Sequence, residues 1–252
     1  MHHEHWNTHG YLVVENVLER AEVSRLLGAI DEVLARRSAG HTVTQGNGAW
    51  KIDQAIAQTS ALDPLVDHPR LLPLLLSLLG PFLQILGTEI FVREAGREPL
   101  VPWHTDGGAT LARFLPVPGA PVLQMKAQFF LTDVTEDDCG NFMLVPGSHR
   151  RPFVEGDVRH AVQLRVHAGD VLLFPWSLWH AVAPNRGGVR KSVTFRYGQL
   201  WSRPYDYERL PRPVLDRMTP RQRRMFGDLG ADVHPSGFFY VDEEEQMRIL
   251  AG

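Results

Sequence analysis

Three side chains in this sequence have the types and spacing of a metal site. His104 and Asp106 lie two residues apart in the segment PWHTDGG, and His180 follows 74 residues after Asp106 in LLFPWSLWHAVAPN. Residues i and i+2 of an extended strand project to the same side, so His104 and Asp106 can reach one ion. Two imidazoles and one carboxylate hold Fe(II) on one face and leave the opposite face open to other ligands.

Each member of this set also has a simpler explanation. A His-x-Asp pair is common by chance, and the aromatic surroundings of His180 favour a buried core histidine when that segment is considered alone. Zinc is the competing metal, but structural zinc sites usually close four positions with Cys and His. The chain has a single cysteine, Cys139. The combination of the three residues therefore favours an open iron site.

Most other histidines are explained without a metal. His2, His3, His5 and His9 lie in a polar N-terminal segment, for which we expect surface exposure or disorder. His149 follows a Pro-Gly turn in VPGSHR, where we expect it to form hydrogen bonds.

A candidate for binding a co-substrate lies ten residues after His180. Arg190 stands in NRGGVRKSVTFRYG, where we expect a strand. A guanidinium group binds a carboxylate through two parallel hydrogen bonds and stays charged. Arg190 therefore suits the far carboxylate of 2-oxoglutarate, whose keto-acid end chelates iron. Ser192 lies on the same strand face and can add a hydroxyl donor. The alternative for Arg190 is a solvated charge beside a Gly-Gly turn.

The composition limits the setting of these residues. The chain has 252 residues, 44% of them hydrophobic and 22% charged, which is ordinary for a globular protein. A net charge of −3 gives no reason to expect a nucleic-acid partner. A single cysteine excludes an internal disulfide framework. The N-terminus does not resemble a signal peptide, and the longest apolar run is too short to cross a bilayer. We expect a soluble, cytoplasmic protein with no membrane partner, either a monomer or a homodimer.

The first part of the chain, about residues 1–81, is expected to be helical. The segment ERAEVSRLLGAIDEVLARR has apolar residues at helical spacing, and GYLVVENVL before it predicts a short strand. The apolar run from Leu71 to Gly80 predicts a buried helix, with Pro69 near its first turn and Gly80 past its end.

From residue 82 to about residue 201 the chain changes to short strands. FLQILGTEIFVRE, VLQMKAQFFLTDV, NFMLVPG, AVQLRV, DVLLFPW and KSVTFRYGQL are strand-like, with Gly, Pro, Asp and Asn between them. Such a series predicts a β-sandwich or a barrel. Residues 202–252 are a polar extension with one helix expected at about Pro220 to Leu229. We expect one domain over residues 1–252.

From about Trp103 to Tyr197 the sequence resembles the phytanoyl-CoA dioxygenase family of Fe(II)/2-oxoglutarate-dependent oxygenases. The motifs are WHTDGG, FFLTDVTEDDCGNFMLVPGSHR, GDVLLFPWSLWHAVAPN and RKSVTFRY, and the opening GYLVVENVLERAEVSRLL is typical of the family's start. The resemblance implies a mainly β fold, a double-stranded β-helix (jelly-roll, cupin-like barrel) with flanking helices. It implies metal ligation by His104, Asp106 and His180, and a co-substrate role for Arg190.

Two departures from the family pattern concern the co-substrate. The interval from His180 to Arg190 is ten residues, where family members often have eleven. Val182 stands where many members have a serine, and Ser192 is our candidate replacement for that hydroxyl. Asn185 matches an asparagine of the family, for which we expect a role in shaping the turn.

The resemblance also implies the reaction. Fe(II), 2-oxoglutarate and O2 would oxidise an unactivated C–H bond, most simply by hydroxylation, with release of succinate and CO2. Desaturation, epimerisation and cyclisation use the same ligands and stay open. We expect a small or mid-sized, largely apolar metabolite of specialised metabolism as substrate, free or as a thioester. The rival hypothesis is a cupin-like barrel that binds metal without turnover, which would have no particular need for Arg190.

Two further segments are candidates for lining a substrate pocket. The loop from Gly107 to Gln124, which carries Arg113, is either a substrate lid or a long surface connection. Gln124, Lys126 and Gln128 share one face of a predicted strand, and one of them could line the pocket.

Overall fold

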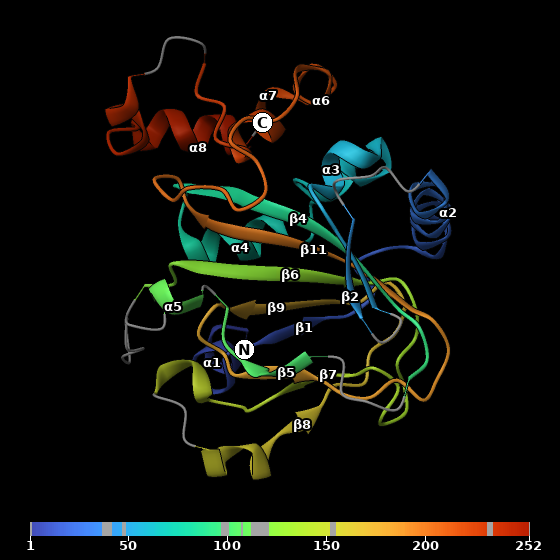
Figure 1. Ribbon diagram of the computed structural model, residues 1–252. Coiled ribbons are helices and arrows are strands. Elements are labelled where there is room, and N and C mark those ends of the chain that lie inside the picture. The colour runs from blue at the N-terminus through green and yellow to red at the C-terminus, as the bar shows by residue number, and fades with distance from the viewer. Residues whose placement is uncertain are drawn as a thin grey trace.

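The computed structural model describes residues 2–36, 42–46, 49–96, 101–106, 108–111, 121–151, 155–230 and 234–251. In these ranges the strands form a seven-stranded sheet and a four-stranded sheet, with antiparallel pairing throughout (Figure 1). In spatial order the larger sheet contains β1 (Leu12–Val14), β9 (Val171–Pro175), β6 (Gln124–Phe130), β11 (Arg190–Gln199), β4 (Leu83–Arg93), β3 (Ala49–Asp53) and β2 (Thr42–Gly46). The smaller sheet contains β5 (Val101–His104), β10 (His180–Val182), β7 (Phe142–Leu144) and β8 (Val162–Gln163).

The order of these strands confirms the predicted jelly roll. From β4 to β11 the chain passes back and forth between the two sheets: β4, β6, β9 and β11 join the larger sheet, and β5, β7, β8 and β10 join the smaller one. Two facing sheets built from eight alternating strands are the pattern of a double-stranded β-helix. The six strands predicted between residues 82 and 200 correspond to β4, β6, β7, β8, β9 and β11, whereas the short strands β5 and β10 were not predicted.

Alternation along β6 determines which side chains face the inside of the barrel. Met125, Ala127 and Phe129 belong to the large hydrophobic core that the helices cover. Because neighbouring residues of a strand project to opposite faces, Lys126 and Gln128 face the barrel interior. β11 runs beside β6 with Arg196 paired to Lys126, so its own inward face carries polar side chains at the same level. The barrel therefore has an apolar outer face and a polar interior wall.

One end of the interior is closed by an apolar cluster. Its buried members come from both sheets and the loops between them: Phe130, Val134, Phe142, Leu144, Leu164, Val166, Leu172, Phe174 and Leu178. Burial of this much apolar surface excludes water from that end of the barrel. The polar groups of the interior therefore lie next to an apolar surface from which water is excluded.

In the described ranges seven helices pack on the outside of the larger sheet, and Figure 1 shows the C-terminal helices on the side of β4, away from the smaller sheet. These are α1 (His2–His9), α2 (Arg20–Arg36), α3 (Ala55–Gln58), α4 (Leu72–Leu79), α6 (Arg212–Asp216), α7 (Pro220–Met225) and α8 (Glu243–Ala251). A further short helix, α5 (Gly108–Leu111), follows β5 along the chain. Short 3-10 turns lie at Ser60–Leu65, Ser148–Arg150, Glu155–His160 and Pro235–Phe238. The helices α2, α4 and α7 were predicted, whereas α1, α3, α5, α6 and α8 were not.

Two expectations for residues 1–81 need correction. The part expected to be helical also contributes β2 and β3 to the larger sheet, with Ile52 of β3 paired to Ile90 of β4. The helix α4 begins at Leu72, so Pro73 and not Pro69 occupies its first turn. Gly80 ends the helix as expected, with a φ of 82° that a residue with a Cβ rarely adopts.

The N-terminal segment, for which surface exposure or disorder was expected, forms a helix; disorder was therefore wrong, whereas His3 is exposed as expected. Trp6 of α1 is 4% exposed and belongs to the large core. His3 Nε2 lies 2.6 Å from the Ser77 hydroxyl, and the rings of His5 and His9 lie 4.5 Å apart between centroids. Docking of this segment through Trp6 could not be predicted from the sequence, because one Trp in a polar segment does not produce a periodic pattern.

No helix in the described ranges combines the length and the apolar character that a membrane crossing requires.

Replacement of Trp6 tests whether α1 is part of the folded core. Trp6→Ala should lower the free energy of unfolding by about 3 kcal/mol, because a large buried aromatic side chain is lost. Urea unfolding followed by circular dichroism measures this change. Thr8→Ala, at an exposed position of the same helix, is the matched control and should change stability little. Equal stability of both variants would mean that α1 does not dock on the core in solution.

Candidate metal centre

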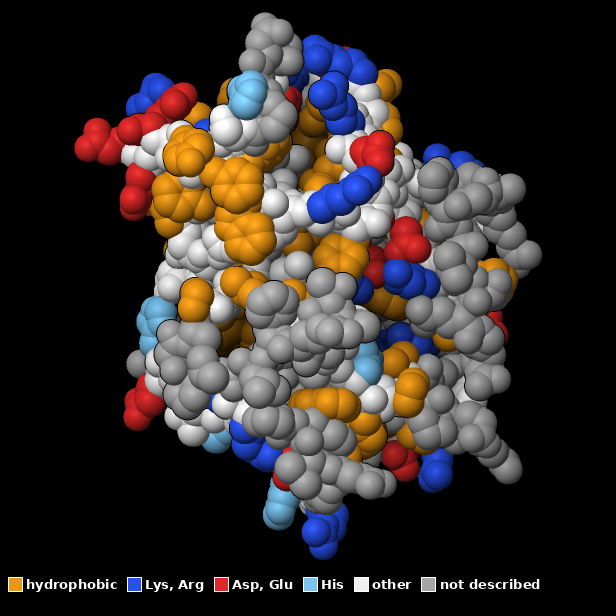
Figure 2. All heavy atoms as spheres, turned by 60° about the vertical axis from the view of Figure 1, so that its left-hand side comes forward, with side chains coloured by type: hydrophobic (Ala, Val, Ile, Leu, Met, Phe, Trp, Pro, Cys, Tyr) orange, Lys and Arg blue, Asp and Glu red, His pale blue; other side chains and the backbone are white. Residues whose placement is uncertain are grey.

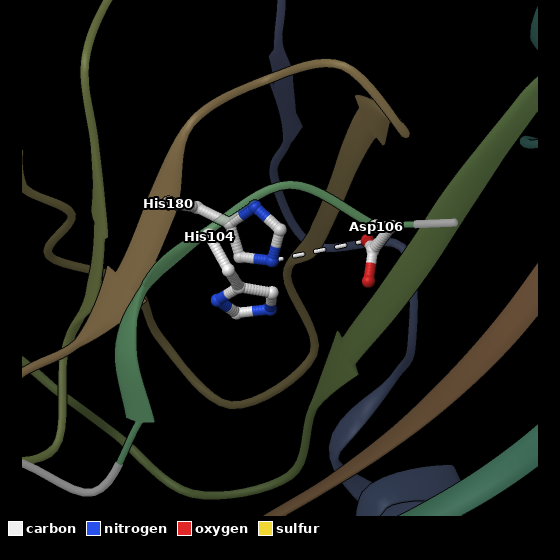
Figure 3. Close-up of side chains that lie close together, drawn as sticks. All are labelled: His104, Asp106 and His180. Atoms are coloured by element: carbon white, nitrogen blue, oxygen red, sulfur yellow. Dashed lines mark ion pairs between the residues drawn. The ribbon is translucent and has the colours of Figure 1, made fainter. Parts of the chain in front are cut away.

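Strand pairing in the smaller sheet brings the two predicted histidines together. His104 is the last residue of β5 and pairs directly with His180, the first residue of β10. Their rings lie 4.2 Å apart between centroids. Asp106 follows β5 by two residues, and its backbone N–H donates to the carbonyl of Trp176 at 2.9 Å. Each residue of the triad offers one ligand atom, and these atoms all lie within 4.8 Å of one another (Figure 3).

Both imidazoles present the same nitrogen to this centre. His104 Nδ1 lies 2.9 Å from the carbonyl of Pro102, and His180 Nδ1 lies 2.8 Å from the carbonyl of Leu178. A carbonyl only accepts hydrogen bonds, so Nδ1 carries the proton in each ring and Nε2 keeps its lone pair. His180 Nε2 faces Asp106 Oδ2 at 3.8 Å. This arrangement leaves two neutral nitrogens free to bind a cation.

The environment of His180 keeps it neutral. Phe142 stacks on its ring at 5.1 Å between centroids, and Phe174 contacts it edge-on at 5.0 Å. Burial lowers the pKa of His180 to about 3, and this outweighs the attraction of the Asp106 carboxylate. A neutral imidazole is the form that ligates metals.

The two oxygens of Asp106 have different surroundings. Oδ1 accepts a hydrogen bond from Lys126 Nζ at 2.7 Å and lies 3.9 Å from Arg196 Nη1. Oδ2 is buried and has no hydrogen-bond partner. Burial by itself would raise the pKa of Asp106, but the nearby charges, that of Lys126 first, hold it well below its usual range. A buried anionic oxygen without a donor is costly, and a cation held between Oδ2 and the two Nε2 atoms would satisfy it. The donor set thus fits a divalent metal.

A buried ion-pair network supports Asp106 from behind. Glu89 of β4 is 3% exposed and binds Arg196 through both carboxylate oxygens, at 3.1 Å and 3.2 Å. Lys51 of β3 reaches the same carboxylate at 2.7 Å. Burial opposes ionisation of Glu89, but these cations lower its pKa to about 2. Arg196 is therefore held beside Asp106 by a carboxylate that stays charged at neutral pH.

Arg190 and Ser192 lie on β11 but do not reach the triad by hydrogen bonds. Arg190 is 3% exposed and donates to the carbonyl of Gly140. The Ser192 hydroxyl accepts from Gln128 Nε2 at 3.1 Å. The arginine of β11 that approaches Asp106 is Arg196, six positions further along the same inward face. Arg190 and Ser192 therefore lie near the start of β11, whereas Arg196, further along the same strand, lies beside Asp106.

The candidates on β6 separate into three roles. Lys126 binds the triad, Gln128 binds Ser192, and Gln124 accepts a hydrogen bond from the Tyr205 hydroxyl at 2.8 Å. Glu89 and Arg196 were missed in the sequence, although an acid in the middle of the apolar run LQILGTEIFV is the signal that could have indicated a buried partner. Most of the loop considered as a lid, including Arg113, lies outside the described residues.

His149 does not behave as expected. The sequence predicted hydrogen bonds for its ring, but both ring nitrogens are buried without a partner. The ring packs on Gly10, where an added Cβ would lie 2.3 Å from Nδ1. Burial lowers the pKa of His149 to about 4, so the ring is neutral and packs as an aromatic group. Asn185 does shape the turn as expected, because its Nδ2 lies 2.9 Å from the Gly188 carbonyl and its Oδ1 accepts from the Gly187 N–H at 3.1 Å.

The C-terminal segment forms one wall near this centre. Tyr205 covers Arg196, with the guanidinium carbon 4.9 Å from the ring centroid. A cavity of about 260 Å³ beside it is lined by Lys51, Asp53, Gln54, Gly87, Glu89, Arg196, Tyr205 and Asp206. Figure 2 shows hydrophobic side chains gathered on the upper part of one face, and large exposed ones of the C-terminal segment are Trp201, Tyr205, Phe239, Tyr240 and Met247.

Comparisons with known proteins agree with this geometry. A sequence model of the phytanoyl-CoA dioxygenase family matches residues 6–193. The dioxygenase cdmA of Talaromyces verruculosus is 30% identical over 243 residues, which cover 86% of this chain and 79% of that protein.

Solved structures share the fold. The α-ketoglutarate-dependent epimerase SnoN from nogalamycin biosynthesis superimposes with a TM-score of 0.65 at 22% identity, over 78% of this chain and 79% of that chain. HygX from Streptomyces hygroscopicus, solved with nickel, 2-oxoglutarate and hygromycin B, gives a TM-score of 0.65 at 20% identity, over 79% and 87% of the two chains. At these identities the two structures establish the jelly-roll architecture for this chain.

Removal of Lys126 tests the support of Asp106. Lys126→Met should weaken binding of a divalent metal such as Co(II) by about 10- to 100-fold at pH 7, because Asp106 loses the donor that fixes its orientation and keeps it ionised. The loss should be larger at pH 5.5, where the carboxyl competes more strongly for a proton. Calorimetric titration at both pH values measures this. Lys191→Met removes a lysine that pairs with Asp31 at the surface and should leave metal affinity unchanged. Unaltered affinity in Lys126→Met would contradict the role given to Lys126.

Proposed function

The chain belongs to the phytanoyl-CoA dioxygenase family, and we propose that it is an Fe(II)/2-oxoglutarate-dependent oxygenase that oxidises a C–H bond of a small metabolite. The observation that carries this proposal is the triad of His104, Asp106 and His180, with two neutral Nε2 atoms and one unpartnered carboxylate oxygen directed at a common point. Three protein ligands on one side leave the other side for co-substrate and O2.

The protein groups have separate tasks in this proposal. When bound, Fe(II) with 2-oxoglutarate and O2 supplies the oxidising power, and succinate and CO2 are the co-products. His104, Asp106 and His180 hold the metal, and Lys126 fixes Asp106. The stacked ring of Phe142 and the apolar cluster behind it exclude water from the side of His180.

Arg190 is our candidate for the far carboxylate of 2-oxoglutarate, and Ser192 for an added hydroxyl contact. Support comes from the burial of Arg190, whose Nε has no hydrogen-bond partner. A buried guanidinium with unused donors requires an anion. A barrel that only stored metal would not need this group, so the observation favours the oxygenase over the non-catalytic alternative.

The described wall of the cavity next to Arg196 modifies the expectation of a largely apolar substrate. Lys51, Asp53, Glu89 and Arg196 line it, and only the Tyr205 ring offers an apolar surface there. Charged groups already paired with one another still offer hydrogen bonds to a ligand. We propose a metabolite that carries polar groups on the side facing this wall. The relatives bind such small molecules as nogalamycin RO and hygromycin B in their solved structures.

A metabolite screen scored by succinate release tests the proposed function. Products identified by mass distinguish the outcomes: gain of one oxygen for hydroxylation, loss of two hydrogens for desaturation or ring closure, and unchanged mass for epimerisation. We expect hydroxylation, and because SnoN is an epimerase, an unchanged mass is the second candidate. Failure of Fe(II) and 2-oxoglutarate together to produce a visible charge-transfer band under anaerobic conditions would favour the non-catalytic barrel.

Loss of either histidine should abolish turnover. His104→Ala and His180→Ala should each weaken Fe(II) binding by well over about 100-fold, since a ligand and not merely its support is removed. The barrel should stay folded, because its core does not depend on the metal. Succinate formation and circular dichroism measure the two effects. His160→Ala, at an exposed position, is the control. Wild-type turnover in either ligand variant would remove that residue from the ligand set.

Loss of Arg190 should act on the co-substrate and spare the metal. Arg190→Ala should raise the KM for 2-oxoglutarate by about 10- to 100-fold, the worth of one buried charge-assisted contact, with little change in Fe(II) affinity. Arg190→Lys should recover only part of the loss, because an ammonium cannot form the paired hydrogen bonds. Steady-state kinetics at saturating Fe(II) measure this. Full recovery by lysine would show that only the charge matters.

A further inference from the structure

A second arginine faces Arg190 inside the barrel. Arg93 is the last residue of β4 and pairs directly with Arg190, the first residue of β11, so both side chains project from the same face of the larger sheet. Arg93 is 5% exposed and Arg190 is 3% exposed. Two positively charged side chains therefore lie side by side in the interior.

Neither guanidinium group has an acidic partner among the described residues. Arg190 donates to the Gly140 carbonyl and lies over the Phe130 ring at 5.4 Å, but its Nε is unpartnered. Arg93 lies over the Phe91 ring at 5.3 Å, and its buried Nη1 is likewise unpartnered. The ring contacts reduce the cost of burial but provide no anion.

This pair differs from the other, partly buried cations of the barrel. Lys126, Arg196 and Lys51 each bind a carboxylate, namely Asp106 or Glu89. Burial lowers the pKa of Arg190 to about 9, with the charge of Arg93 adding to the effect, and burial lowers the pKa of Arg93 to about 10. Both groups therefore remain protonated at neutral pH, and their repulsion is uncompensated.

The backbone around the pair is fixed independently of any ligand. Asn185 Nδ2 lies 3.2 Å from the Arg93 carbonyl, and the Gly96 and Asn185 backbones exchange hydrogen bonds of 2.6 Å and 3.0 Å. Gly140 has a φ of 74°, and a Cβ there would lie 3.3 Å from Arg190 Cδ. The backbone that carries the two arginines is thus held by the turns where β4 ends and β11 begins, as a preorganised site requires.

We propose that Arg93 and Arg190 form one dicationic pocket for a single carboxylate, with Arg93 as a second positioning residue for the co-substrate. The identity of that carboxylate as the far end of 2-oxoglutarate rests on the proposed function, whereas the anion site itself rests on two guanidinium groups that have no acidic partner among the described residues and an unpartnered nitrogen each. A carboxylate between the two guanidinium groups would accept hydrogen bonds from both, including from the nitrogens that have no partner now.

The test uses glutarate and metal-free protein. Glutarate has both carboxylates of 2-oxoglutarate but no keto oxygen for metal chelation, so its binding reports the anion site alone. Glutarate should raise the thermal unfolding midpoint above that in sodium chloride of equal ionic strength. Arg93→Met should weaken glutarate binding by about tenfold or more, because one charged donor group is lost. The same variant should be more stable than the parent chain without glutarate, because an unpaired buried charge has been removed.

Three further variants make the outcomes distinct. Arg93→Lys should bind glutarate with intermediate affinity and serves if Arg93→Met does not fold. The double variant Arg93→Met/Arg190→Met should lose the glutarate effect. Arg165→Met removes an exposed arginine paired with Asp137 and should change nothing. A purely structural role for Arg93 predicts the opposite result, in which Arg93→Met lowers stability and leaves glutarate affinity unchanged; that result would overturn the inference.

The proposed function and this inference can fail separately. If glutarate stabilises the protein through both arginines but the protein never consumes 2-oxoglutarate, the anion pocket is supported and the proposed oxygenase function is contradicted. If Arg93→Met forms succinate with an unchanged KM for 2-oxoglutarate, the oxygenase function is supported and the proposed role of Arg93 is contradicted.

Discussion

The pairing of charged side chains around Asp106 is the constraint on which the metal site depends. Asp106 and Glu89 are surrounded by Lys51, Lys126 and Arg196, and each of these three cations is bound to one of the two carboxylates. An isolated charge at this position would be costly, so each member of this network depends on its partners. The result of the network is local: one oxygen of Asp106 is fixed by Lys126 and the other is left free beside two imidazoles.

Strand pairing in the two sheets brings this network next to the two histidines. His104 and His180 are opposite each other because β5 and β10 pair in the smaller sheet, and Lys126 and Arg196 are opposite each other because β6 and β11 pair in the larger one. The two sheets face each other, so residues far apart in sequence converge on Asp106. Family membership and the solved relatives establish this framework, and the chemistry of the site comes from the residues on its inner face.

The sequence predicted the parts of the site that local spacing encodes. His104 and Asp106 were found from an i, i+2 interval, and His180 from its place after an apolar strand. The support of Asp106 could not be predicted in the same way, because Glu89, Lys126 and Arg196 lie on three different strands whose registers are known only from the fold. The helix α1 and the packed ring of His149 were also missed, since each depends on tertiary contacts that local spacing does not encode, such as Trp6 with the core and His149 with Gly10. Arg93 was missed for the same reason, because its importance depends on its pairing with Arg190 of β11.

The wall formed by Tyr205 has a consequence for how such enzymes diverge. The Tyr205 side chain contacts the barrel through its ring with Arg196 and its hydroxyl with Gln124, and its backbone N–H donates to the Leu86 carbonyl. It stands after β11, outside the strands that carry the metal ligands. A different side chain at this position would therefore change the shape of the cavity without replacing a metal ligand, and the backbone bond to Leu86 does not depend on the side chain. In this architecture the shape of the cavity wall and the set of metal ligands can therefore change separately.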